Sequence, residues 1–129
     1  MKKAVLVLMA VLFLAATGFA MDHGAMKMSM KGKQVTMTGF MSCTFCSMGS
    51  GKQCTSKDCC VECVKAGDPV TLHGDKGMLY ILLTNEQGKA LMTPERIELL
   101  GGKVKVKGIM VKRGGLQAIF VESMEKAEQ

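Results

Sequence analysis

Residues 103–124, KVKVKGIMVKRGGLQAIFVESM, contain two apolar runs separated by a pair of glycines. Val104 and Val106 alternate with lysines, which is the period-two pattern of a strand with one buried face. Arg113-Gly114-Gly115 has the composition of a hairpin turn. The stretch therefore predicts a β-hairpin whose strands are residues 103–112 and 116–124.

Three shorter runs upstream also have the composition of strands. In the first of them, Val35, Met37 and Met41 occupy alternate positions, and in the third, MLYILLT is continuously apolar. A helix is expected to begin with Thr93 as its N-cap and Pro94 at its first position, and to end at Gly101-Gly102. The predicted upstream strands are residues 34–42, 69–73 and 78–84.

The order of these elements predicts the fold class. Five strands with a helix between the third and the fourth follow the order of an OB-fold, whereas a β-sandwich has about seven strands. We therefore expect a mainly β protein, a five-stranded OB-fold-like barrel with a Cys-rich insertion, residues 43–66, after the first strand. Within the insertion, residues 44–57 have the composition of a loop, and residues 56–66 that of a short helix with Ser56 as its N-cap.

Five segments of this chain resemble small exported bacterial OB-fold proteins that carry a Cys-rich first loop. The resemblance covers about residues 34–124 and implies the fold and the position of the insertion. Members of that group are mostly of unknown function, so the resemblance implies no activity. The segments are VTMTGF (35–40), GDPVTL (67–72), GMLYILLT (77–84), GGKVKVKG (101–108) and GGLQAIFVESM (114–124).

The first twenty residues predict export. Lys2 and Lys3 precede an apolar run that is shorter than a membrane span, and Gly18 and Ala20 are small residues at the −3 and −1 positions. We expect a signal peptide at residues 1–20, a periplasmic or secreted protein, and no stable membrane anchor after cleavage. The rest then divides into a polar tail (21–33), one small domain (34–124) and a solvated end (125–129).

Composition argues against several functions. The net charge is +6 without a dense basic run, and the chain has five Phe, one Tyr and no Trp, so nucleic acid is not an expected partner. There is no C-x-x-C-H motif for haem and no glycine-rich loop for a nucleotide. No set of Ser, His and Asp or paired carboxylates can be argued, and His73 is expected at the surface. We therefore expect a protein that is not an enzyme.

All six cysteines lie between Cys43 and Cys63, in the pattern C-x2-C-x7-C-x4-C-C-x2-C. In an oxidising compartment an even number of cysteines favours disulfides, with fifteen possible connectivities. The adjacent Cys59 and Cys60 are poorly placed to bond to each other, and bridges confined to one insertion would leave the barrel unstapled. Disulfides thus remain one of three interpretations.

The second interpretation is a metal site. Two C-x2-C pairs can supply the four sulfurs of a tetrahedral site, and soft thiolates bind zinc or copper(I). In this interpretation Cys43, Cys46, Cys60 and Cys63 form the principal site, and Cys54 and Cys59 support it.

The tail strengthens the case for copper. If cleavage follows Ala20, the mature chain begins Met21-Asp22-His23, whose four nitrogens suit copper(II). The thioethers of Met26, Met28 and Met30 suit copper(I), and they lie in a polar segment with no apolar partners.

The third interpretation is a thiol–disulfide redox protein, in which Cys60 lies in the first turn of a helix and Cys63 resolves it. No thioredoxin-like context surrounds this pair. The sequence therefore predicts an exported metal-binding protein with copper favoured over zinc. The alternatives are a disulfide-stapled OB-fold binding module and, less favoured, the redox protein. The expected partners are a metal ion and another exported protein.

Overall fold

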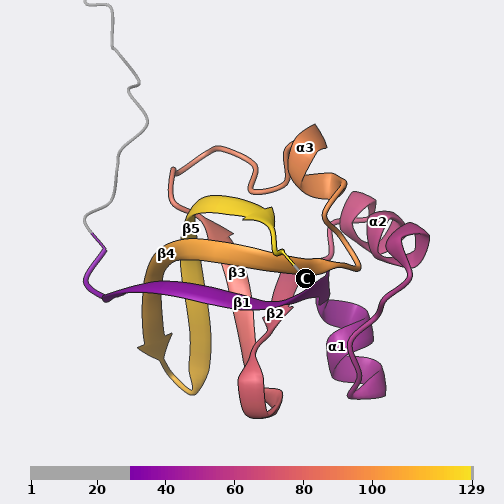
Figure 1. Ribbon diagram of the computed structural model, residues 1–129. Coiled ribbons are helices and arrows are strands. Elements are labelled where there is room, and N and C mark those ends of the chain that lie inside the picture. Colours follow the sequence, from indigo (N-terminus) through magenta and orange to yellow (C-terminus); the bar gives the residue numbers. More distant parts are fainter. Residues whose placement is uncertain (1–29, 129) are drawn as a thin grey trace, which may run out of the picture.

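The computed structural model describes residues 30–128 (Figure 1). The predicted signal peptide, His23, Met26 and Met28 lie outside this range. Within residues 30–128, no helix is long and apolar enough to cross a bilayer. The elements are, in order, β1 (Lys33–Cys43), α1 (Thr44–Ser50), α2 (Lys57–Lys65), β2 (Val70–His73), the 3-10 turn η1 (Asp75–Gly77), β3 (Leu79–Thr84), α3 (Pro94–Ile97), β4 (Lys103–Arg113) and β5 (Leu116–Lys126).

The five strands close into a barrel in the order β1-β2-β3-β5-β4. β3 and β5 run parallel, and the other four pairs are antiparallel. β1 closes the barrel because Phe40 pairs with His73 of β2 on one side and with Lys103 of β4 on the other. The predicted fold class is confirmed: a closed five-stranded mixed barrel with a helical Cys-rich insertion after β1 and a short helix between β3 and β4.

The barrel interior is aliphatic, as the alternating pattern of β4 predicts. Val104 and Val106 are completely buried, while the alternating Lys103, Lys105 and Lys107 are exposed. The larger side chains of the core come from every strand, and the fully buried ones include Met41, Leu72, Ile119 and Val121. With almost no aromatic side chains, this small core depends on close packing of branched residues.

The end of α3 differs from its prediction. The Thr93 hydroxyl accepts from the backbone N–H of Arg96, so the predicted cap is confirmed, but the helix ends at Ile97. Further on, the N–H of Gly101 donates to the carbonyl of Met41 at 2.8 Å. This bond to β1 takes the chain out of the helix before the predicted end at Gly101-Gly102.

The first half of the insertion also differs from its prediction as a loop, because Thr44–Ser50 forms α1. Its serines bond within the helix, since Ser47 donates to the carbonyl of Cys43 and Ser50 to that of Cys46. Serine side chains that satisfy carbonyls four residues back remain compatible with a helix. The helix ends at Gly51, whose φ of 66° is left-handed.

At the C-terminal end, β5 runs to Lys126, into the segment predicted to be solvated. The N–H of Ala127 donates to the carbonyl of Lys103, and Ala127 is buried.

Candidate metal centre

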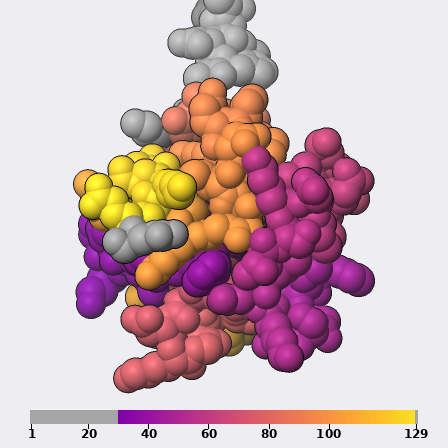
Figure 2. Space-filling model, turned by 45° about the vertical axis from the view of Figure 1, so that its right-hand side comes forward, coloured from indigo at the N-terminus to yellow at the C-terminus, as the bar shows by residue number. Residues whose placement is uncertain are grey.

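The insertion forms a lobe at one end of the barrel (Figure 2). The two ends of this lobe are joined by a hydrogen bond, in which the backbone N–H of Thr44 donates to the carbonyl of Pro69 at 2.9 Å. The Thr44 and Thr71 hydroxyls are 2.6 Å apart, and the N–H of Phe45 donates to Asp68 at 2.7 Å. These bonds hold the start of α1 against the start of β2, so the position of the following cysteines is tied to the barrel.

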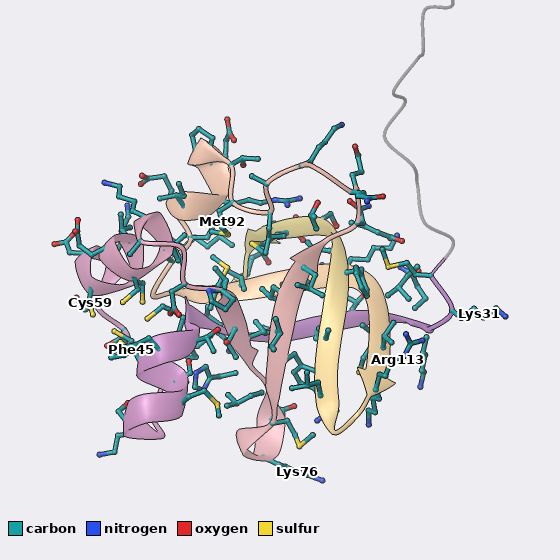
Figure 3. All side chains as sticks on the ribbon, turned by 180° about the vertical axis from the view of Figure 1, so that it is seen from behind. Lys31, Phe45, Cys59, Lys76, Met92 and Arg113 are labelled. Carbon is teal, nitrogen blue, oxygen red and sulfur yellow. The ribbon has the colours of Figure 1, made fainter. Side chains whose placement is uncertain are left out.

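Five of the six sulfurs gather between α1 and α2 in two groups of three. The sulfurs within each group all lie within 4.8 Å of one another. Cys46 belongs to both groups, and its sulfur is 3.7 Å from that of Cys59. Figure 3 shows sulfur atoms collected between the two helices near Cys59 and Phe45. We call the groups the inner triad (Cys43, Cys46, Cys63) and the outer triad (Cys46, Cys54, Cys59).

The two triads differ in exposure. Cys43 ends β1 and is completely buried, whereas Cys59 lies on α2 and is exposed. Cys63 and Cys54 are half-buried. A metal ion in the inner triad would therefore lie against the barrel core, and one in the outer triad would lie near solvent.

The periodicity of α2 explains which of its cysteines reach the triads. Cys59 and Cys63 are four residues apart and lie on the same helix face, which is turned toward α1. Cys60 is the next residue after Cys59 and points into the core, where it is completely buried. Among the described residues, Cys60 joins neither triad. Of the four principal ligands expected from the sequence, the structure thus brings three together, Cys43, Cys46 and Cys63. The fourth, Cys60, is replaced by Cys59, whose sulfur lies near that of Cys46 on α1.

The crowding of the sulfurs makes their ionisation unfavourable. Hydrogen bonding with Cys43 and then with Cys59, together with burial, raises the pKa of the Cys46 thiol well above its usual range. A hydrogen bond with Cys43 and burial raise the pKa of Cys63 to about 11, and burial raises the pKa of Cys60 to about 12. Several thiolates can coexist here only if a cation compensates their charge.

Cys54 is held differently from its neighbours. A backbone hydrogen bond at Ser56 lowers the pKa of the Cys54 thiol, and its own N–H donates to the Ser42 hydroxyl at 3.2 Å. Its position between α1 and α2 is therefore fixed by backbone contacts.

A buried polar network supports the cluster from the barrel side. The Ser47 hydroxyl lies 2.7 Å from Nε2 of His73 and 3.2 Å from the Ser42 hydroxyl. Because Ser47 donates its one proton to the carbonyl of Cys43, the ring nitrogen of His73 is the donor to Ser47. Burial lowers the pKa of His73. His73 was expected at the surface and is half-buried, because it shares a strand face with Thr71 and α1 covers that face.

Met30 lies at the other end of the barrel from the triads. It lines a hollow with Lys31, Arg113 and neighbouring side chains of the β4–β5 hairpin. In Figure 3, Lys31 and Arg113 are labelled at one end of the molecule and Cys59 at the other. The structure therefore does not bring Met30 to the cysteines, and His23, Met26 and Met28 lie outside the described residues.

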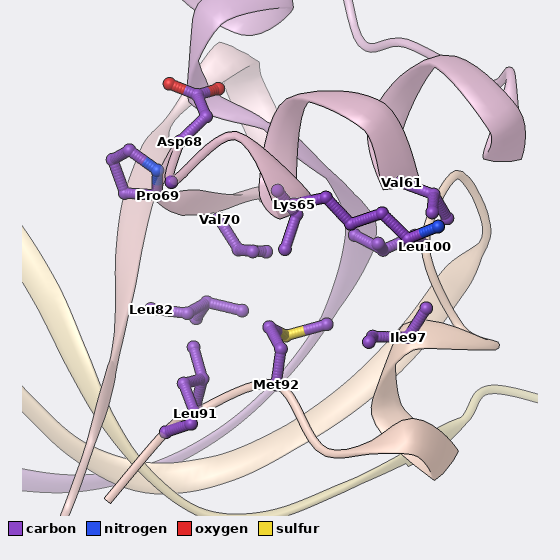
Figure 4. A pocket seen from close by; sticks show the side chains of 13 residues that line it. Val61, Lys65, Asp68, Pro69, Val70, Leu82, Leu91, Met92, Ile97 and Leu100 are labelled. Carbon is purple, nitrogen blue, oxygen red and sulfur yellow. The ribbon is translucent and has the colours of Figure 1, made fainter.

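An apolar pocket of about 370 Å³ lies on another face of α2 (Figure 4). Val61 and Val64 of α2 line it together with Leu82, Met92 and Ile97. α2 thus directs its valines to this pocket and Cys59 and Cys63 to α1.

Comparison with models of protein families, with curated proteins and with solved structures finds no match. The site must therefore be interpreted from its own geometry. It is a cysteine cluster after the first strand of a small five-stranded β-barrel, and its triads could hold a metal ion.

Proposed function

We propose that this protein is an exported, non-enzymatic metal-binding protein that holds a soft metal ion in the thiolate cluster between α1 and α2, with copper(I) favoured over zinc. The observation that carries the proposal is the convergence of five sulfurs from four separate segments on two overlapping triads. Export is inferred from residues 1–20 alone.

The spacing of the sulfurs supports metal binding. Four sulfurs at about 2.3 Å from a central zinc lie about 3.8 Å from one another, and three in a plane around an ion at that distance lie about 4.0 Å apart. The 3.7 Å between the sulfurs of Cys46 and Cys59 is close to both values. A disulfide would instead require these sulfurs to approach to about 2.05 Å.

The number of ligands favours copper(I). Structural zinc is almost always four-coordinate, whereas a soft monovalent ion is satisfied by three thiolates. Each triad offers three sulfurs, and within residues 30–128 no His, Asp or Glu joins either triad. The thioethers predicted to bind copper(I) in the tail add support from the sequence.

The disulfide alternative keeps one specific observation in its favour. Cys46 and Cys59 have sulfurs 3.7 Å apart, and Cys59 is exposed to an oxidant. Metal content and thiol titration of the unreduced protein, purified without oxygen from the exported fraction, separate the two functions. We expect bound copper and six thiols after metal removal in denaturant. A protein with no metal and no free thiol would instead be a disulfide-stapled module.

Two adjacent cysteines provide a matched pair of variants. Cys59→Ser removes a sulfur of the outer triad, whereas Cys60→Ala removes one that belongs to neither triad. Competition against a chromophoric copper(I) chelator should show at least tenfold weaker copper(I) binding for Cys59→Ser and little change for Cys60→Ala. Equal losses in both variants would contradict the proposed ligand set.

A further inference from the structure

We propose that the cluster holds two copper(I) ions, one in each triad, joined by the thiolate of Cys46. This inference rests on the proposed function, because it specifies how many ions the same site takes and how they are connected.

The geometry that points to two ions is the single shared sulfur. Two separate three-coordinate ions would need six thiolates, but the triads contain five because Cys46 is counted in both. Cys46 lies on α1, and its sulfur is within 4.8 Å of the sulfurs of Cys43 and Cys63 and also of those of Cys54 and Cys59. The other four cysteines each belong to one triad only.

Thiolate chemistry allows this arrangement. A thiolate sulfur has more than one lone pair, so it can bind two soft ions at once. Each thiol that becomes a ligand loses its proton, so loading two copper(I) ions releases five protons and changes no oxidation state. Five thiolates around one ion would leave four uncompensated negative charges, and the second ion reduces this excess to three.

The surroundings make the two ions unequal. The inner ion would be held by the buried Cys43, which ends a barrel strand and whose own carbonyl accepts a hydrogen bond from Ser47. The outer ion would be held by the exposed Cys59 and by Cys54, which lies in the segment between the helices. We therefore expect the inner ion to bind more tightly and the outer ion to exchange first.

The experiment is an anaerobic copper(I) titration of the reduced full-length chain, followed by native mass spectrometry. It is done in a background in which Met26, Met28 and Met30 are replaced by Leu, so that tail thioethers do not add to the count. We expect saturation at two ions, and an X-ray absorption spectrum with a copper–copper contact. Cys59→Ser and Cys63→Ser should each saturate at one ion, and Cys46→Ser should lose tight binding of both.

Cys60→Ala is the control and should still take two ions. Far-UV circular dichroism establishes that each variant retains its strands, so that a lost ion is not a lost fold. Saturation at one ion, or at more than two, would overturn the two-ion arrangement but leave the proposed function standing. An unmodified chain that binds no copper(I) would overturn both. Cys46→Ser behaving like Cys59→Ser would also count against a bridging sulfur.

Discussion

Ser47 is a small buried hydroxyl that connects the barrel to the helix carrying Cys46. It donates to the Cys43 carbonyl and accepts from His73, while the Ser42 hydroxyl lies within reach. The Cys43 carbonyl belongs to a completely buried residue, so solvent cannot readily replace the Ser47 hydroxyl there, whereas His73 is half-buried. Ser47 should therefore contribute more to the stability of the fold than a serine at the surface.

Replacing Ser47 with Ala should lower the free energy of unfolding of the metal-free protein by about 1–3 kcal/mol, because it removes two hydrogen bonds, one to the buried Cys43 carbonyl and one from the half-buried ring of His73. Urea denaturation followed by circular dichroism measures the change. Ser50→Ala is the matched control on the same helix, because Ser50 also donates to a carbonyl but is exposed. Its effect should stay within about 0.5 kcal/mol. Equal effects at the two positions would argue against the buried network.

His73 makes the stability of the metal-free protein depend on pH. Burial lowers its pKa in the folded state, so between that pKa and the ordinary value of about 6.5 the unfolded chain binds more protons. The stabilisation that the neutral His73 ring gives to the folded state is complete above about pH 6.5 and is lost as the pH falls toward the lowered pKa. His73→Gln keeps an N–H donor and does not titrate, so its unfolding free energy should fall less between about pH 7 and 5. Identical pH profiles for the two proteins would exclude this role.

At the scale of elements, α2 shows how a helix sorts adjacent cysteines. Neighbouring residues on a helix point about 100° apart, so Cys59 and Cys60 cannot serve the same site, whereas Cys59 and Cys63 can. The C-x2-C spacing of Cys60 and Cys63 suggests a ligand pair from sequence alone. The four-residue spacing of Cys59 and Cys63, combined with the predicted helix, is the signal that identifies the face turned toward α1.

β1 contains a glycine, Gly39, at which an added side chain would clash with the backbone of β2. A methyl group at Gly39 would lie 2.2 Å from the carbonyl oxygen of His73, which is backbone and cannot move aside easily. Gly39→Ala should therefore destabilise the barrel by about 2–3 kcal/mol. A methyl group at Gly49, in α1, would have no neighbouring atom within 4 Å. Gly49→Ala should therefore stabilise the folded protein by about 0.5–1 kcal/mol. Thermal unfolding of both variants tests this, and a neutral Gly39→Ala would show that the strands can separate at this point.

The strands could be predicted from sequence because their evidence is local. Alternation in Val104 and Val106 and the Gly114-Gly115 turn are sufficient to identify the β4–β5 hairpin, and the order of elements predicts the barrel. α1 could not be predicted, since its serine and glycine content is that of a loop and its bonds to β2 and His73 are tertiary. The early end of α3 has the same origin, a backbone bond to β1 that local sequence does not contain.

At the scale of the whole molecule, metal binding should add to a fold that already exists. Strands β1–β5 and most of the core lie outside the insertion, so removal of metal should leave the far-UV spectrum of a β protein. An ion at a hundred times its Kd stabilises the folded state by about 2.7 kcal/mol, which for about 100 residues raises Tm by roughly 10–20 °C. Melts with and without a copper(I) chelator measure this shift. A metal-free chain that is unfolded would show that the metal is needed for the fold itself.

The pairing of β1 with β4 bears on the order in which the chain folds. Phe40 meets Lys103, far along the chain, whereas the triads are assembled from residues 43–63 alone. Contacts between distant residues form slowly, because the entropy cost of closing the intervening loop comes before any favourable contact energy. We expect the sulfurs to meet each other, and any metal or oxidant, while β4 and β5 are still unfolded. Whether the six thiols bind metal or form disulfides would then depend on which reaction is faster during refolding. Pulsed thiol alkylation can follow both in time.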